Sequence, residues 1–131
     1  IQDYLKAILK IKMDKKVDKV KVSEIASMLS VSVPAVTDKI KRLVSLDYVK
    51  NFPYKGVDLT EKGNQVALRM IRHHRLWELF LTQELGVSKD KVHEEAERLE
   101  HACSDYLMDI IDKKLGYPQL DPHGQPICPQ Q

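Results

Sequence analysis

Glu97, Glu100 and His101 stand at positions i, i+3 and i+4 of the stretch VHEEAERLEHACSDYLMDIID, which covers residues 92–112. Residues three and four apart share one face of a helix, so a single amphipathic helix over this stretch would bring two carboxylates and an imidazole to one spot. Such a set faces water or holds a cation. The apolar stripe predicted for this helix comprises Ala96, Leu99, Cys103, Leu107, Ile110 and Ile111.

A second group of the same chemistry precedes this stretch. His74 and Glu78 stand at i and i+4 of a helix predicted over residues 61–85, and His93 follows it. Facing helices commonly supply the ligands of metal sites in helical assemblies. Carboxylates with imidazoles suit Mn(II), Fe(II) or Zn(II), and the absence of a thiolate cluster argues against a soft metal. Each pair taken alone is also compatible with a solvated acidic surface.

Three further residues receive plain structural interpretations from the sequence. Asp3, at the start of the first helix, is first of all an acidic residue favoured by the helix dipole. Cys103 continues the apolar stripe and is predicted to lie in the core. His73 is predicted to be a surface histidine, since it lies about 100° around the helix from His74.

The composition of the 131-residue chain limits the class of protein. A hydrophobic fraction of 43% with five Gly and six Pro favours a helix-rich globular protein over disorder. No apolar run approaches the ~20 residues of a membrane span, so no membrane partner is expected. Two cysteines make no disulfide framework, and we expect a reduced, cytoplasmic protein.

Charge divides the chain into two parts. Residues 1–62 hold 13 lysines and arginines against 8 acidic residues, whereas residues 63–131 hold 8 against 11, together with all five histidines. A basic first part suits a polyanion, and an acidic part rich in histidine suits a cation. We therefore predict a DNA-binding domain over residues 1–62 and a helical dimerisation and metal-binding domain over residues 63–131.

The first part has the pattern of a helix-turn-helix. Helices are predicted over residues 3–13, over 24–29 with Ser23 as N-cap, and from Ser32 and Pro34 to about Leu46. A short strand is possible over residues 20–22. The last of these helices is expected to bury Val36, Ile40, Leu43 and Val44. In a helix-turn-helix, the second helix of the pair enters the DNA major groove.

A hairpin then completes a winged helix-turn-helix. Residues 48–52 and 56–59 are strand-like, residues 53–56 form the turn between them, and Thr60 is placed to cap the following helix. The predicted fold is mainly helical, with an N-terminal winged helix-turn-helix followed by an all-helical region. The residues predicted to face DNA are Ser32, Pro34, Ala35, Thr37, Asp38, Lys39, Lys41, Arg42, Lys50, Tyr54 and Lys55.

Two other functions compete with DNA binding under metal control. A metallohydrolase could use Glu and His around a divalent ion to activate water, but the sequence shows neither a phosphate-binding Gly loop nor a separate general base. A winged-helix protein-interaction module with incidental metal affinity is the other alternative. Binding to duplex DNA that depends on salt would separate this module from a DNA-binding protein.

The chain also resembles a known family along nearly its whole length. The resemblance rests on the segments DYLKAI, VSEIASMLSVSVPAVTDKIKRL, DYVKNFPYKGVDLTEKG, IRHHRLWELFL, AERLEHACSD and LDPHGQPI. Together they resemble the diphtheria toxin repressor family, most closely its manganese transport regulator branch. The ExxEH run that follows HRLxELFL is the most specific part. The resemblance implies a homodimeric, metal-dependent transcriptional repressor that binds a palindromic operator and controls metal-uptake genes.

The resemblance also implies two metal sites. The first would use Asp3, Glu97, Glu100 and His101; the second would use His74, Glu78 and His93, with Asp121 and His123 as additions. Manganese-type members often have Glu where this chain has Lys6, which argues against a two-manganese cluster. Iron-type members have Met and Cys at the positions of Asp3 and Glu97. Oxygen ligands there favour Mn(II), while Zn(II) and Fe(II) stay open.

Overall fold

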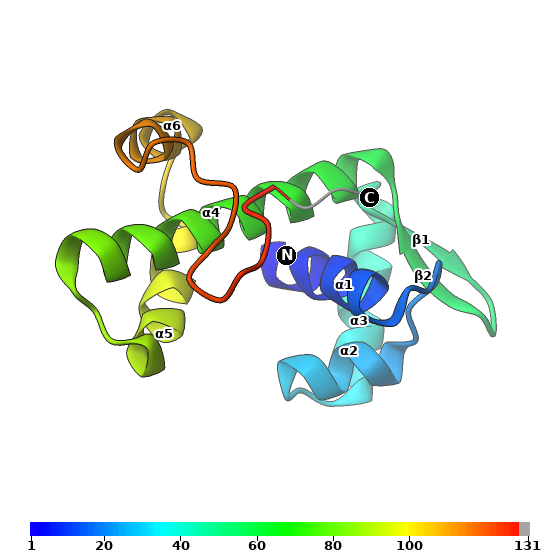
Figure 1. The fold of residues 1–131 in the computed structure, drawn as a ribbon. Helices are drawn as coiled ribbons and strands as arrows, with labels where there is room; N and C mark the ends of the chain where they lie inside the picture. Colours follow the sequence, from blue (N-terminus) through cyan, green and yellow to red (C-terminus); the bar gives the residue numbers. More distant parts are fainter. Residues whose placement is uncertain (129–131) are drawn as a thin grey trace. The chain divides into compact units, whose positions relative to one another are not determined.

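The computed structural model describes residues 1–128, which form helices and one small antiparallel sheet (Figure 1). The predicted mainly helical fold with a winged N-terminal region is confirmed. The chain divides into two compact units, residues 1–68 and residues 69–131, and each is described separately. The predicted boundary between residues 62 and 63 stays a prediction of the sequence.

Unit 1 begins with three helices, α1 (Gln2–Lys15), α2 (Val22–Leu29) and α3 (Val33–Ser45). Ser32 is the N-cap of α3, as predicted, and its hydroxyl accepts from the amide of Ala35 at 3.3 Å. The predicted cap at Ser23 is wrong, because α2 already begins at Val22. There Glu24 caps instead, its carboxylate accepting from the amide of Lys21 at 3.1 Å.

The core of unit 1 forms where the apolar faces of these helices meet. Its fully buried side chains include Leu5, Ile8, Leu9, Val20, Ile25, Val36, Leu43 and Val57. Val44, which was predicted to be buried, is 40% exposed. It lies about 100° around α3 from Leu43, and this turns it to the edge of the buried face.

A hairpin follows α3. Strand β1 (Val49–Phe52) pairs with β2 (Gly56–Leu59) in the register Val49↔Leu59 to Phe52↔Gly56. Val20, for which a strand was possible, forms a bridge to Val57 through two hydrogen bonds of 2.8 Å, and the chain becomes helical at Val22. Gly56 is required here, since a Cβ on it would lie 2.5 Å from the carbonyl oxygen of Val20.

Helix α4 (Glu61–Leu85) has the predicted bounds and passes from unit 1 into unit 2. Thr60 caps it as predicted: its hydroxyl accepts from the amide of Gly63 at 3.1 Å and donates to the carbonyl of Asp47 at 2.7 Å. Among the described residues, no helix is long and apolar enough to cross a bilayer.

The prediction of a single helix over residues 92–112 is wrong. The chain forms α5 (Lys89–Glu100) and α6 (Asp105–Lys114), separated by residues 101–104. Ser104 starts α6 by accepting from the amide of Leu107 at 3.1 Å, and its extended backbone cannot continue a helix. The break also changes the apolar stripe: Ile111 is buried, whereas Leu107 and Ile110 are 39% and 47% exposed.

The core of unit 2 gathers between α4, α6 and the C-terminal loop. Leu76, Met108, Ile111 and Ile127 are buried together there. Trp77, Phe80, Cys103 and Leu115 are partly buried and pack against this cluster. The loop is thus an integral part of unit 2, because its Ile127 is only 3% exposed.

Candidate metal centre and nucleic-acid interface

His74 and Glu78 form the buried middle of the candidate metal centre. They lie one turn apart on α4, with Nε2 of His74 3.0 Å from Oε1 of Glu78, and each side chain is 4% exposed. Burial disfavours the charged form of Glu78, but the hydrogen bond to His74 and the neighbouring imidazoles outweigh it. The pKa of Glu78 is therefore held below its usual value. The carboxylate is kept ionised, which is the form that binds a cation.

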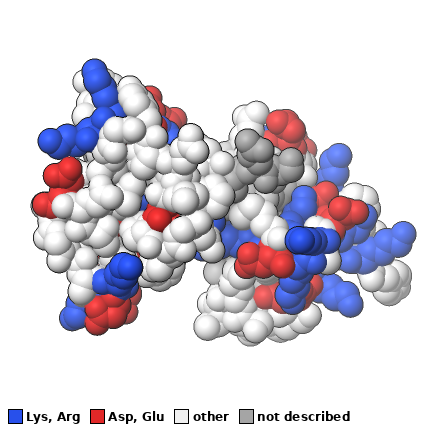
Figure 2. All heavy atoms as spheres, viewed as in Figure 1, with Lys and Arg blue, Asp and Glu red and all other residues white. Residues whose placement is uncertain are grey.

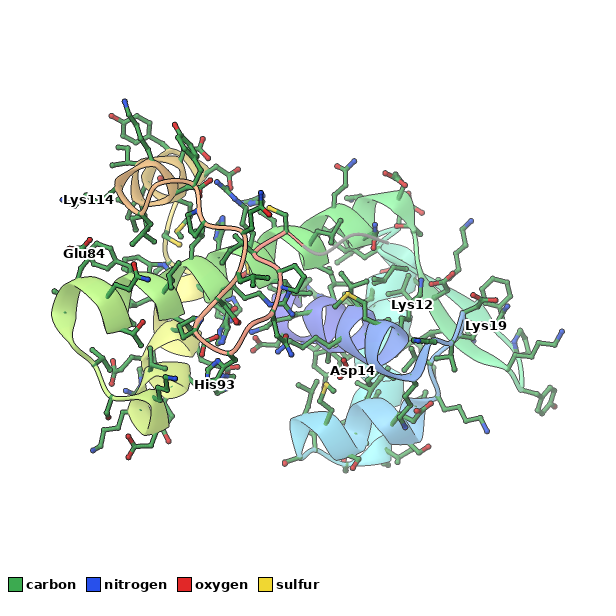
Figure 3. All side chains as sticks on the ribbon, viewed as in Figure 1. Lys12, Asp14, Lys19, Glu84, His93 and Lys114 are labelled. Carbon is green, nitrogen blue, oxygen red and sulfur yellow. The ribbon has the colours of Figure 1, made fainter. Side chains whose placement is uncertain are left out.

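Helix α5 brings two more groups against the same histidine. His93 approaches His74 with a nitrogen-to-nitrogen distance of 3.1 Å, and Oε1 of Glu100 lies 3.6 Å from Nδ1 of His74. Glu100 is completely buried, whereas the side chain of His93 is 56% exposed and faces Glu97 at 3.3 Å. Figure 3 shows His93 projecting from α5. These contacts place candidate ligands from α5 on two sides of the His74 ring.

The loop over residues 121–124, with the sequence DPHG, supplies the last two predicted metal ligands of unit 2, Asp121 and His123. Asp121 holds the loop with one carboxylate oxygen, which accepts from the amides of His123 at 2.9 Å and Gln125 at 2.8 Å. Arg75 on α4 donates to the Pro126 carbonyl and to the Gln125 side chain. Nδ1 of His123 lies 3.6 Å from Oε2 of Glu78, so the loop presents its imidazole to α4.

Among the described residues of unit 2, three overlapping groups have ligand atoms within 4.8 Å of one another. They are His74, Glu78 and His93; His74, Glu97 and Glu100; and Glu78, Asp121 and His123. Oε2 of Glu78 is buried without a hydrogen-bond partner, which is costly unless a cation or proton compensates it. The residues therefore fit a divalent ion, and their oxygen and imidazole donors suit Mn(II), Fe(II) or Zn(II).

The first predicted site divides between the two units. Asp3 lies in the first turn of α1 in unit 1 and is exposed, whereas Glu97, Glu100 and His101 belong to unit 2. Within unit 2, Nε2 of His101 lies 3.8 Å from Oε1 of Glu100, at the end of α5. The participation of Asp3 stays a prediction of the sequence.

His73 corrects the sequence prediction most clearly. It was predicted to lie at the surface, yet its side chain is completely buried, with Nδ1 3.2 Å from the carbonyl oxygen of Glu100 and Nε2 3.1 Å from Asp105. Helical spacing places His73 away from His74 but does not show what packs there. Arg75 was also missed, because the loop that it anchors is distant in sequence and has no local signal.

The candidate nucleic-acid interface lies on the outward face of α3. Val36, Ile40 and Leu43 point to the core, and the opposite face is exposed. The exposed residues of α3 and its cap that were predicted to meet DNA are Ser32, Pro34, Ala35, Thr37, Asp38, Lys41 and Arg42. Lys39 is half-buried, with its ammonium 5.8 Å from the centre of the Tyr4 ring. At 100° per residue, Asp38 lies near the middle of the outward face.

The hairpin presents the remaining predicted DNA contacts. Lys50 and Lys55 are exposed, and Tyr54 at the hairpin tip packs against nothing and has a positive φ of 67°. Figure 2 shows lysine and arginine side chains gathered over the part of the molecule where Figure 1 places β1 and β2. A basic hairpin beside a groove-reading helix can bind the phosphate backbone without reading sequence.

Both parts of the chain match models of one protein family. Residues 1–57 match the N-terminal DNA-binding domain of iron-dependent repressors, and residues 60–129 match their metal-binding and dimerisation domain. An uncharacterised HTH-type transcriptional regulator of Methanocaldococcus jannaschii is 39% identical over 85% of this chain and 88% of its own length. The HTH-type transcriptional regulator MntR of Geobacillus kaustophilus is 35% identical over 77% of this chain and 71% of its own.

Solved structures agree with these matches. A manganese-dependent transcriptional repressor in complex with manganese is 46% identical, with a TM-score of 0.84 over 96% of this chain. The manganese regulator SloR is 40% identical, with a TM-score of 0.80 over 95% of this chain. The chain spans 57% and 60% of the length of those two chains. These relatives are transcriptional regulators, and this removes the support for a metallohydrolase.

The metal-binding relatives differ in their metals. They include the manganese regulator SloR, the iron-dependent repressor IdeR and the manganese-activated repressor ScaR, which has also been solved with bound Zn2+. The donor chemistry of unit 2 agrees with this range. On the two domain matches, the sequence identities and the shared fold, the chain belongs to the iron-dependent repressor family, to which the diphtheria toxin repressor and the manganese regulators belong.

Proposed function

We propose that this chain is a cytoplasmic, metal-activated transcriptional repressor that binds a palindromic operator as a homodimer and controls metal-uptake genes. The observation that supports it most is the buried Glu78 carboxylate, which has an oxygen without a hydrogen-bond partner inside a ring of imidazoles. Burying an ionised carboxylate in this way lowers the stability of the fold unless a bound cation pairs with it. Family membership supplies the regulatory context for that site.

Manganese(II) is the proposed physiological ion. Asp3, Glu97 and Glu100 would supply oxygen donors where softer sites use sulfur, and these donors suit hard ions. Zn(II) and Fe(II) bind similar sets, and cellular supply decides among them. The bound ion supplies positive charge that neutralises the clustered carboxylates.

Residues of the chain would link binding of the metal ion to recognition of DNA. The family resemblance adds Asp3 on α1 to Glu97, Glu100 and His101, and we propose that this set links ion binding to the DNA-binding unit. Two α3 helices of a dimer must meet successive major grooves about 34 Å apart. A tenfold shift toward that arrangement needs about 1.4 kcal/mol of preferential ion binding.

The α3 helix and the hairpin divide the work on DNA. Lys41, Arg42, Lys50 and Lys55 would contact phosphates and give affinity, since lysine and arginine supply most salt-dependent binding. Ser32, Pro34, Thr37 and Asp38 stand where base edges are read. The N-cap and the proline fix the backbone at the start of α3, so these side chains reach the groove from a rigid helix end.

Gel-shift titration of the native operator with Mn(II), Zn(II), Fe(II) or chelator tests the proposal. We expect binding to strengthen by at least about tenfold with the activating ion, which corresponds to about 1.4 kcal/mol. A scrambled duplex of equal length measures the non-specific background. Equal operator affinity with and without chelator would reject metal control, and equal affinity for both duplexes would reject operator recognition.

A further inference from the structure

His73 is a buried histidine that belongs to none of the ligand groups in the described chain. Its ring stands between two acceptors, with Nδ1 3.2 Å from the carbonyl oxygen of Glu100 and Nε2 3.1 Å from Oδ1 of Asp105. Both ring nitrogens thus point to hydrogen-bond partners. His73 therefore joins α4 to the end of α5 and to the start of α6.

The Glu100 carbonyl is one that α5 itself cannot satisfy. The last four carbonyl groups of a helix have no intrahelical donor, and α5 ends at Glu100. The ring of His73 and the thiol of Cys103, whose sulfur lies 3.6 Å away, both approach this oxygen. The indole of Trp77 in turn donates to that sulfur at 3.2 Å. The backbone at Glu100 is therefore held from α4 by specific groups.

The same residue presents its side chain to the metal centre. The Glu100 carboxylate is completely buried, lies 3.6 Å from Nδ1 of His74, and is 3.8 Å from the ring of the next residue, His101. His73 and His74 are neighbours on α4, so one helix segment contacts Glu100 twice: His73 at its carbonyl and His74 at its carboxylate. A shift of this backbone would move two predicted ligands together.

We propose that His73 is a positioning residue for the metal centre: its Nδ1–H fixes the Glu100 carbonyl and thereby aims the Glu100 carboxylate and the His101 ring. The inference rests on the proposed metal-dependent function. Groups that orient metal ligands from outside the coordination sphere typically change metal affinity by about 10- to 100-fold when removed. We expect that range for loss of the contact between His73 and Glu100.

Two amide substitutions separate the two contacts of the ring. In His73→Asn the side-chain amide nitrogen takes the place of Nδ1 and can still donate to Glu100. In His73→Gln the amide nitrogen takes the place of Nε2 and can still donate to Asp105. By calorimetric titration with Mn(II) at fixed pH, we expect His73→Asn to stay within about threefold of the wild type and His73→Gln to lose about tenfold or more.

Asp105→Ala makes the same separation without changing the buried ring, should either substitution at His73 unfold the protein. It removes the Nε2 partner and keeps the Glu100 contact, so its Mn(II) affinity should match the wild type. Arg72→Gln is the control for general loosening. Arg72 binds Asp109 at 2.9 Å and Asp112 at 3.3 Å, and so ties α6 to α4 without reaching α5. It should lower the unfolding temperature and leave Mn(II) affinity unchanged.

A double-mutant cycle supplies the decisive measurement. If His73 acts through Glu100, the loss of Mn(II) affinity caused by His73→Gln should be smaller in the Glu100→Gln background than in the wild type, with only the part that acts through His101 remaining. Its effect should add in full to that of Asp121→Asn. Equal affinities for the Asn and Gln variants, or additivity with Glu100→Gln, would overturn the positioning role while wild-type metal binding stands. A wild-type protein that binds no Mn(II), Zn(II) or Fe(II) would overturn the proposed function itself and this inference with it.

Discussion

Nε2 of His74 and Nδ1 of His93 lie 3.1 Å apart, within hydrogen-bond distance, and both nitrogens are potential ligands. Their ring centroids are 4.7 Å apart and the rings are tilted by 64°. An ion bound by both nitrogens must displace any proton that either of them carries, because a coordinated imidazole is neutral and its ligating nitrogen bears no hydrogen. Metal binding at this pair should therefore release protons and weaken as the pH falls.

His93 allows this pair to be tested without damage to the fold, since its side chain is 56% exposed. We expect His93→Ala to lower Mn(II) affinity by about tenfold or more, because one of the ligand groups loses a nitrogen. Glu84→Ala is the control: Figure 3 shows Glu84 on α4, away from His93, and it is exposed. Calorimetric titration would contradict the prediction if both variants bound Mn(II) as the wild type does.

The exposed apolar face of α6 predicts where two copies meet. Tyr106, Leu107 and Ile110 lie at helical spacing and are 77%, 39% and 47% exposed. They belong to the part of the chain, residues 60–129, that matches the metal-binding and dimerisation domain of the family, so a second copy would cover them. We expect Ile110→Glu to convert the dimer to a monomer at micromolar concentration, because a charge would be buried at an apolar interface. Lys50→Glu changes an exposed charge on the hairpin of unit 1, outside this face, and should stay dimeric. Sedimentation equilibrium that shows Ile110→Glu still dimeric would exclude this face.

Local sequence signals predicted much of unit 1 because its elements are defined by residues near in the chain. Ser32 and Thr60 each cap a helix through an amide three residues later, a pattern visible without any tertiary structure. The spacing of His74 and Glu78 on one helix face is equally local. Capping and helical periodicity were therefore sufficient to place these side chains.

The features that the sequence did not predict depend on contacts between residues that are far apart in the chain. Helical periodicity continues through residues 92–112, but α5 ends at Glu100 and Ser104 starts α6. The Glu100 carbonyl that this break exposes is satisfied by His73, 27 residues earlier. The burial of His73 depends on two elements that a single-helix interpretation had merged. The same holds for Arg75, whose partners on the loop lie about 50 residues away. Such pairings have no signature in local spacing.

The ion pair between Lys15 and Glu24 predicts an acid-sensitive contribution to the stability of unit 1. Nζ of Lys15 donates to Oε2 of Glu24 at 2.5 Å. This bond and the backbone bond from Lys21 hold the pKa of Glu24 below its usual value. Because the folded pKa is lower than the unfolded one, the stabilisation is full above the unfolded value of about 4.3 and disappears as the pH falls through the folded pKa.

Glu24→Gln should accordingly lower the unfolding temperature at neutral pH and leave it unchanged in strong acid. The pair is largely solvated at Lys15, which is 58% exposed, so the effect is limited to about 1 kcal/mol or less. Glu94→Gln, an exposed change on α5, should show no such pH dependence. Thermal melts at several pH values would contradict the assignment if the two variants behaved alike.

Lys41 and Asp38 on the outward face of α3 predict opposite changes in DNA binding. Lys41→Ala should remove one phosphate contact and reduce the slope of log affinity against log salt by about 0.9, by the same amount for every DNA sequence.

Asp38→Asn removes the one negative charge near the middle of the outward face of α3, where the carboxylate repels phosphates and can accept from a cytosine amino group. It should strengthen binding to a scrambled duplex and reduce the ratio of operator affinity to scrambled-duplex affinity. Fluorescence anisotropy at a series of salt concentrations measures both changes, with Lys114→Ala as the control outside unit 1. If Lys41→Ala kept the wild-type slope and Asp38→Asn the wild-type preference, α3 would not be the element that faces DNA.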